Sequence, residues 1–210
     1  MLILTLLAHP DDAELWAGGT LCKHGRRGDD IICLTFFEHM PQRMAECRHA
    51  ASELGLGEPR FLGTPAYTMP STDAVLTELD GRVPDVVVTH WHKDTHLEHR
   101  LCCELSLALT HHWKRHVKKT PLLLMCSTYF MRGLASFDPD VIIDIDEVVA
   151  VKEKAVRAYA SQKVEHLLGD VDAQAALLGA RIGCRRAEGF IEYPLFGHTR
   201  TRERPHLDLA

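Results

Sequence analysis

Short apolar runs alternate with helical patterns along this 210-residue chain, and this alternation limits the possible folds more than any other feature. We predict strands at 2–7, 30–37, 60–63, 84–90 and 121–126, and a strand or extended segment at 141–145. Helices are expected within 13–27, 41–54, 72–79, 98–114, 146–161 and 170–186, with Asp146 as the N-cap of the fifth. The alternation predicts right-handed βαβ units, and therefore a Rossmann-like α/β three-layer sandwich around a mostly parallel central sheet.

The composition is ordinary for a globular protein, with 46% hydrophobic and 25% charged residues. We expect one domain at residues 1–198 and a loosely held tail at 199–210. The formal net charge is −5 and there is no long basic run, which argues against nucleic acid or a membrane surface as a partner. No apolar stretch reaches the length of about 18 residues that a transmembrane helix needs. A homo-oligomer remains possible.

Cysteine usage and the first residues bear on the compartment. The seven cysteines are scattered without a C-x-x-C pair, which predicts reduced thiols in a cytoplasmic protein. The N-terminal segment lacks the basic region and the cleavage site of a signal peptide, and is better interpreted as a strand. The G-x-G-x-x-G fingerprint is missing after the first strand, which disfavours a nucleotide-binding Rossmann-like protein.

Two polar clusters follow predicted strands. Ala8-His9-Pro10-Asp11-Asp12 comes directly after the first strand, with Gly18-Gly19 downstream, and a histidine-rich segment at 89–100 follows the strand at 84–90. Both lie at carboxyl ends of strands, where open α/β sheets bind ligands. His9, one carboxylate of the Asp11/Asp12 pair and one histidine of the second cluster could together hold zinc. The structural alternatives are an acidic helix N-terminus for the first cluster and a solvated surface segment for the second.

The two clusters together resemble the motifs of the LmbE-like, PIG-L-type zinc-dependent N-deacetylases. The first family motif is Ala-His-Pro-Asp-Asp followed by a spaced Gly-Gly, and here it is 8–12 with 18–19. The second is His-x-Asp-His at a helix start, and here it is His96-Leu97-Glu98-His99, in which Glu98 replaces the usual aspartate. Weaker similarity continues at Arg43, Lys152 and 187–190, so the resemblance covers nearly the whole chain.

The resemblance implies a division of roles. The metal ligands would be His9, Asp12 and His99, holding Zn²⁺ or another divalent ion. Asp11 would be the general base, and His96 would stabilise the oxyanion. Glu98 matches the acidic residue that orients His96, and we expect it to raise the pKa of His96 and favour the imidazolium form.

Other residues have weaker assignments. By resemblance, Arg43 and Tyr129 are candidates for substrate binding, although a helix-surface arginine and a half-buried strand tyrosine are the alternatives. His90 and His92 could line the cleft, support the ligands from behind or lie on the surface, and Asp94 could orient a ligand histidine or simply begin the loop. The candidate rim segments are 37–41, 65–71 and 130–138.

The resemblance therefore implies a metal-dependent hydrolase that removes an N-acetyl group from an amino sugar or a related small molecule, releasing acetate and a free amine. One alternative is an amidase acting on a larger amide conjugate. Another is a metal-binding module without catalysis, although such a module would not need Asp11 if Asp12 binds the metal. The identity of the substrate is not encoded in these motifs.

Overall fold

The computed structural model of the protein describes residues 1–37, 40–128, 131, 133 and 135–195. Its strands are β1 (Leu2–Leu7), β2 (Asp30–Thr35), β3 (Arg60–Phe61), β4 (Val86–His90), β5 (Leu122–Cys126), β6 (Val141–Asp144) and β7 (Ala187–Glu192). Its helices are α1 (Asp12–Arg26), α2 (Pro41–Glu53), α3 (Thr72–Leu79), α4 (Leu97–His116), α5 (Val149–Arg157) and α6 (Val164–Ile182). The predicted tail at 199–210 and Tyr129 lie outside the described residues.

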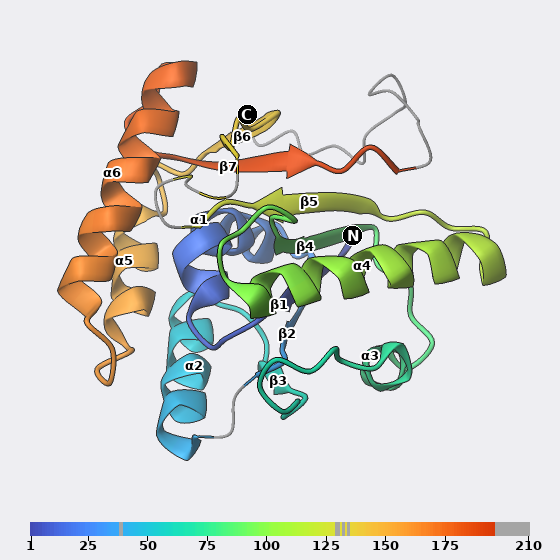
Figure 1. Ribbon diagram of the computed structural model, residues 1–210. Helices are drawn as coiled ribbons and strands as arrows, with labels where there is room; N and C mark the ends of the chain where they lie inside the picture. The colour runs from blue at the N-terminus through green and yellow to red at the C-terminus, as the bar shows by residue number, and fades with distance from the viewer. Residues whose placement is uncertain (38–39, 129–130, 132, 134, 196–210) are drawn as a thin grey trace.

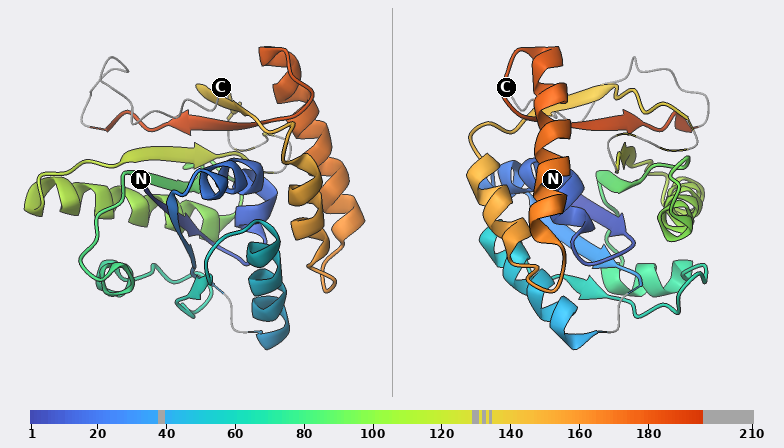
Figure 2. Two further views of the ribbon diagram at one scale, coloured as in Figure 1. Left: turned by 180° about the vertical axis from the view of Figure 1, so that it is seen from behind. Right: turned by 60° about the vertical axis from the view of Figure 1, so that its left-hand side comes forward.

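The strands form one sheet in the order β3-β2-β1-β4-β5-β7-β6 (Figure 1). Neighbours from β3 to β5 pair in parallel, whereas β7 runs antiparallel to both β5 and β6. Helices α1, α2, α5 and α6 cover one face of the sheet, and α3 and α4 cover the other (Figure 2). The predicted three-layer α/β sandwich with a mostly parallel sheet is therefore confirmed.

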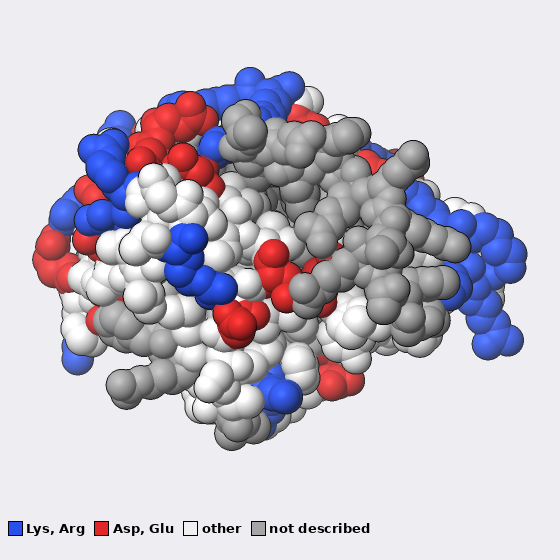
Figure 3. Space-filling model, turned by 90° about the horizontal axis from the view of Figure 1, so that it is seen from above, with Lys and Arg blue, Asp and Glu red and all other residues white. Residues whose placement is uncertain are grey.

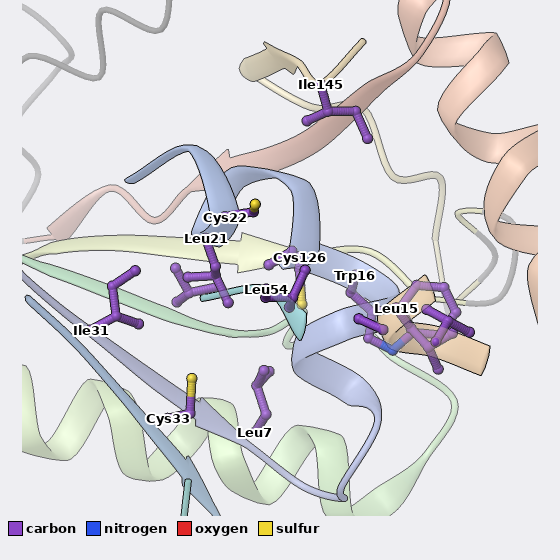
Figure 4. Packing of buried hydrophobic residues seen from close by; sticks show 14 of the residues in the cluster. Leu7, Leu15, Trp16, Leu21, Cys22, Ile31, Cys33, Leu54, Cys126 and Ile145 are labelled. Atoms are coloured by element: carbon purple, nitrogen blue, oxygen red, sulfur yellow. The ribbon is translucent and has the colours of Figure 1, made fainter. Parts of the chain in front are cut away.

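Each face of the sheet has its own hydrophobic core. Alternate residues of β1 point to opposite faces, so that Ile3 and Leu7 pack toward α1 and α2 while Leu4 and Leu6 pack toward α4. Figure 4 shows part of the first core, with Trp16 and Leu21 of α1 among its members. Within the described residues, no helix has both the length and the apolar character needed to cross a membrane.

The C-terminal third differs from the sequence-based expectation. The predicted helix at 146–161 begins only at Val149, because the Asp146 carboxylate accepts the backbone N–H groups of Arg185 and Arg186 and does not cap a helix. Helix α6 begins at Val164, earlier than expected. Strand β7 was not predicted, because its sequence, AEGFIE, contains a glycine and two glutamates and lacks the usual apolar pattern.

One of those glutamates, Glu188, binds the backbone of α1 at the Gly18-Gly19 motif, where Ile145 approaches closely. Glu188 Oε1 accepts the backbone N–H of Gly19 at 2.8 Å, and Oε2 accepts that of Thr20 at 2.8 Å, in the middle of α1. Lys152 of α5 completes the cluster, with Nζ 2.7 Å from Glu188 Oε1. A Cβ atom on Gly19 would lie 2.7 Å from Cγ2 of Ile145, so only glycine permits this approach. The cluster ties the middle of α1 to α5 and β7.

Candidate active site

The two polar clusters meet at one edge of the sheet. Strands β1 and β4 are neighbours and parallel, with Leu6 paired to Thr89, so the segments that follow them emerge side by side. Helix α1 then begins at Asp12 and helix α4 at Leu97. The predicted meeting of the two clusters at the carboxyl edge is confirmed, and it places imidazoles and carboxylates within contact distance.

His9, Asp12 and His99 form a possible metal-binding group. Their ligand atoms all lie within 4.8 Å of one another. His9 Nδ1 lies 3.5 Å from Asp12 Oδ2, and His99 Nε2 lies 3.8 Å from Asp12 Oδ1. Tetrahedral zinc with bonds of about 2.0–2.2 Å holds its ligand atoms roughly 3.3–3.6 Å apart. The three side chains therefore fit a zinc ion in chemistry, and the two separations that involve Asp12 are close to those of a zinc site.

A carboxylate contacts each of these histidines on the side away from Asp12. Asp94 Oδ2 lies 3.0 Å from His99 Nδ1, and Glu98 Oε2 lies 2.8 Å from His9 Nε2. Asp94 is itself held, because it accepts the Thr128 hydroxyl and the backbone N–H of His96. Metal-binding histidines typically donate their second ring N–H to a carboxylate, which orients the ring. Both histidines have this arrangement, with Nδ1 of His9 and Nε2 of His99 on the side of Asp12.

Electrostatics at this site favour an ionised Asp12 with one positive charge beside it. Burial opposes ionisation of Asp12, but the neighbouring imidazoles His90 and His99 outweigh it and hold the pKa of Asp12 well below its usual range. Burial likewise opposes a charge on His9, yet Asp12 and Glu98 raise the pKa of His9 to about 9. The pocket thus favours one positive charge beside Asp12, which is the charge that a bound metal ion brings.

His90 supports the ligand group from behind. Its side chain is fully buried, its ring stacks on His99 with centroids 3.7 Å apart, and its Nε2 accepts the backbone N–H of Ala8 at 3.0 Å. Burial and the charge of His99 lower the pKa of His90 to about 4. Trp16 makes a further contact that sequence reasoning missed, because its indole N–H donates to Asp12 Oδ1 at 3.1 Å. Its position four residues after Asp12, on the same helical face, was the available signal.

Asp11 differs from Asp12 in both backbone and environment. It precedes α1 with φ of 98°, a conformation that a non-glycine residue rarely adopts. Arg43 of α2 donates to Asp11 Oδ2 at 2.8 Å and to the carbonyl of Pro10 at 3.0 Å. Burial and the nearby Asp12 charge raise the pKa of Asp11 to about 7, although Arg43 and His9 act in the opposite direction. The predicted substrate residue Arg43 therefore contacts Asp11 in this structure.

His96 and Glu98 are arranged differently from the expectation. The Glu98 carboxylate contacts His9 and the backbone N–H of Tyr67, the latter at 3.0 Å, while only its backbone N–H reaches His96 Nδ1, at 3.3 Å. The expected rise in the pKa of His96 is wrong. Burial and the charges of His99 and His9 lower that pKa, and they outweigh Glu98.

The remaining candidates lie around this group. His92 is half-buried and contacts the sulfur of Met125, away from the ligand atoms. Tyr67, in the predicted rim segment 65–71, reaches the site through its backbone, a contact that no sequence motif signalled. Charges of both signs share the face shown in Figure 3, and neither sign covers its described part.

Fold and site together define an α/β protein with a histidine–aspartate metal-binding group at the carboxyl edge of a parallel sheet. The family described as PIG-L: GlcNAc-PI de-N-acetylase matches residues 4–110. The chain belongs to this family, and the family resemblance drawn from the motifs is confirmed. The matched residues carry the first polar cluster, the second polar cluster and most of α4.

Individual relatives match parts or all of the chain. A 1D-myo-inositol 2-acetamido-2-deoxy-alpha-D-glucopyranoside deacetylase of Mycobacterium sp. (strain KMS) is 33% identical over 86 residues, which cover 31% of this chain. The match spans only 28% of the length of that curated relative. The activity of the whole mycobacterial protein therefore does not transfer directly to this chain.

Solved structures match over nearly full length. The conserved protein TT1542 from Thermus thermophilus has a TM-score of 0.79 at 24% identity, covering 96% of this chain and 99% of its own. N,N'-diacetylchitobiose deacetylase from Pyrococcus horikoshii has a TM-score of 0.76 at 21% identity, covering 100% and 88%. The 4-carboxy-2-hydroxymuconate hydratase GalB from Pseudomonas putida has a TM-score of 0.80 at 21% identity, covering 96% and 98%. At these identities the structures show a shared fold alone, and that fold carries both amide hydrolysis and hydration.

Proposed function

We propose that the protein is a metal-dependent hydrolase that removes an N-acetyl group from an amino sugar or a related small molecule. The observation that carries this proposal is the contrast between two consecutive aspartates. Asp12 lies beside three histidines and stays ionised, whereas Asp11 lies next to it with a pKa raised to about 7. A metal-binding carboxylate and a proton-transferring carboxylate are the two groups that amide hydrolysis by water requires.

We propose His9, Asp12 and His99 as the metal ligands and Zn²⁺ as the metal, because two imidazoles and one carboxylate are a common zinc set. When bound, the ion would lower the pKa of a water molecule and polarise the substrate carbonyl. Asp94 and Glu98 would keep the two imidazoles oriented. Arg43 would hold Asp11 in place through the bond at 2.8 Å.

The proton steps follow from the position of Asp11. Its carboxylate takes a proton from the attacking water as the water oxygen bonds to the amide carbon. The carbonyl oxygen then carries the negative charge of a tetrahedral intermediate. Asp11 returns the proton to the amide nitrogen, the C–N bond breaks, and the free amine leaves with acetic acid, which loses its remaining proton to solvent and becomes acetate. One water molecule is consumed and Asp11 ends as it began.

His96 would stabilise the oxyanion as a neutral hydrogen-bond donor. Its Nδ1 accepts the backbone N–H of Glu98, so in the neutral ring the proton is on Nε2. The lowered pKa of His96, caused by burial and the charges of His99 and His9, favours this neutral form. We therefore assign an N–H donor, and not an imidazolium, to the oxyanion.

The direct test is acetate release from a panel of N-acetylated sugars by purified protein, before and after removal and return of zinc. We expect about one zinc per chain and acetate release that is lost with the metal and restored by it. Release of a longer acid from larger amides, with no acetate, would favour the amidase alternative. Zinc binding without hydrolysis of either class would favour the non-catalytic module, and no binding of any divalent metal would exclude the proposal.

Two further assignments complete the proposal. The substrate is a small molecule. The protein is cytoplasmic, an assignment that is supported by its seven cysteines, all of which are free thiols in the structure. Residues 1–198 form the catalytic domain. Separation of the cells into membrane, periplasmic or culture fractions and soluble cell contents, followed by detection of the protein, tests the location.

A further inference from the structure

The segment between β3 and α3 is anchored directly to the candidate metal centre. Glu98 Oε1 accepts the backbone N–H of Tyr67 at 3.0 Å, and Oε2 of the same carboxylate lies 2.8 Å from His9 Nε2. The Glu98 side chain is 7% exposed, so both contacts are shielded from water. A single buried carboxylate thus joins a candidate metal ligand to a surface loop 31 residues away along the chain.

The loop holds Tyr67 in an uncommon conformation. Its φ is 60°, in the left-handed region that aromatic residues rarely adopt. Such backbone strain persists only where neighbouring contacts impose it, and it concentrates at binding sites. The bond to Glu98 is one such contact. The side chain gains no burial in return, because Tyr67 is 69% exposed.

Tyr67 belongs to an apolar rim. Among the described residues, the large hydrophobic side chains that are exposed include Met40, Tyr67, Met69 and Leu97. All four follow carboxyl ends of strands: Met40 after β2, Tyr67 and Met69 after β3, and Leu97 at the start of α4. These four exposed side chains therefore follow strand ends at the edge that holds the candidate active site, where apolar surface is typical of ligand binding.

We propose that Tyr67 is a platform for the apolar face of a pyranose ring and that Glu98 is the positioning residue that sets this platform at a fixed place relative to His9. This inference rests on the proposed function and narrows its substrate class to cyclic amino sugars. The C–H face of a sugar ring is flat and apolar, and a phenol ring offers a matching surface without a charge. The longer side chain of Glu98 is what reaches both groups, since an aspartate would be shorter by one methylene.

The platform is tested by comparing a cyclic with an acyclic substrate. For N-acetylglucosamine, Tyr67→Ala should raise KM by about tenfold and change kcat by less than about twofold, because the ring contact acts in binding. For N-acetylethanolamine, which has no ring, the KM ratio of variant to parent should stay near one. Tyr67→Phe keeps the ring and should restore the KM for the sugar. Leu177→Ala, at a site 56% exposed on α6, is the matched control.

Saturation-transfer NMR on the metal-free protein separates this inference from the proposed function. With N-acetylglucosamine as the probe, the ring protons should receive saturation in the parent and in Tyr67→Phe, and lose most of it in Tyr67→Ala. The same result in a protein without hydrolytic activity would overturn the proposed function and keep the platform. Equal KM values and equal saturation in the parent and Tyr67→Ala would overturn the platform, whatever the activity.

Glu98 is tested through the backbone of Tyr67. Hydrogen exchange at the Tyr67 amide should accelerate by about tenfold or more in Glu98→Asp, because the shortened carboxylate loses its reach. Glu98→Gln keeps an acceptor oxygen at the same reach and should keep the slow exchange. Saturation transfer to the sugar ring protons should change in parallel with the exchange rate. It should be lost in Glu98→Asp and kept in Glu98→Gln. Unchanged exchange in Glu98→Asp would show that Glu98 does not position Tyr67.

Discussion

Replacing Glu188 by glutamine should destabilise the whole fold, because one buried carboxylate makes three contacts there. Its oxygens accept the N–H groups of Gly19 and Thr20, both at 2.8 Å, and the Lys152 ammonium at 2.7 Å. The side chains of Lys152 and Glu188 are 6% and 3% exposed, so water cannot replace these contacts without rearrangement. The network joins β7 to the middle of α1, whose first turn carries Asp12.

The expected loss of stability follows from the buried groups that Glu188→Gln leaves without a partner. The amide has one acceptor oxygen, and its NH₂ group would face a donor on the other side. The Lys152 charge would remain buried without a counter-ion, and removing one partner of a buried ion pair costs about 3–5 kcal/mol. An unpaired helix N–H costs roughly 1–3 kcal/mol, and the two losses overlap because they share one carboxylate. We expect a loss of about 4 kcal/mol, or a fall in Tm of roughly 8–16 °C for a domain of this size.

Urea unfolding of a double-mutant cycle is the assay. Lys152→Met removes the buried charge while Glu188 keeps both helix N–H groups, so the double variant should be at least about 1.5 kcal/mol more stable than the sum of the single losses predicts. The control is Glu58→Gln, which breaks a surface ion pair with Arg48. The Glu58 side chain is 69% exposed, so this change should alter the free energy of unfolding by less than about 0.5 kcal/mol. A loss below about 1 kcal/mol in Glu188→Gln, or strict additivity, would refute this reasoning.

Four further results are expected at the active site. Asp11→Asn should lower kcat by about 10²–10⁴ with zinc content near one per chain, since only the proton carrier is lost; loss of zinc would mean that Asp11 and Asp12 have exchanged roles. Because burial and Asp12 raise the pKa of Asp11 to about 7, Asp11 is protonated and inactive as a base below that pH, and kcat/KM should fall as the solution becomes acidic. A bound cation favours the carboxylate, so the acid limb of the pH profile should lie at or below pH ~7, and a midpoint well above it would contradict the assignment. Asp94→Asn should weaken zinc binding by about 10–100-fold in competition with a chelating dye, and unchanged affinity would remove its orienting role. His96→Ala should lower kcat by about 10²–10³; an unchanged kcat would show that His96 does not contact the oxyanion.

The residues of the metal-binding group were predictable because each follows a strong strand. Apolar runs at β1 and β4 define two strand ends, and a parallel sheet brings the carboxyl ends of neighbouring strands to one edge. Pattern and sheet geometry single out His9, one carboxylate of the Asp11/Asp12 pair and one histidine of the second cluster, since such groups are costly at the end of a buried strand unless they serve a function. The choice of Asp12 and His99 within these clusters came from the family resemblance.

The supporting contacts were not predictable because they depend on tertiary packing. Glu188 meets Gly19 across 169 residues, and β7 lacks the apolar pattern by which a strand is recognised. The Glu98 carboxylate could contact either neighbouring histidine, and the direction of its side chain decides for His9. The lowered pKa of His96 likewise depends on burial and on which charges surround the ring.

The two consecutive aspartates show how one turn of backbone separates two chemical roles. Asp11, with a φ of 98°, has its carboxylate against Arg43, while Asp12, the first residue of α1, meets the imidazoles. Burial then raises one pKa, and the histidines lower the other against the same burial. Carboxylates whose pKa values are pushed apart can act as acid–base and as ligand at the same pH. The strained backbone at Asp11 therefore helps to give the two aspartates different roles. Any substitution that relaxes this strain should reduce proton transfer more than it weakens metal binding.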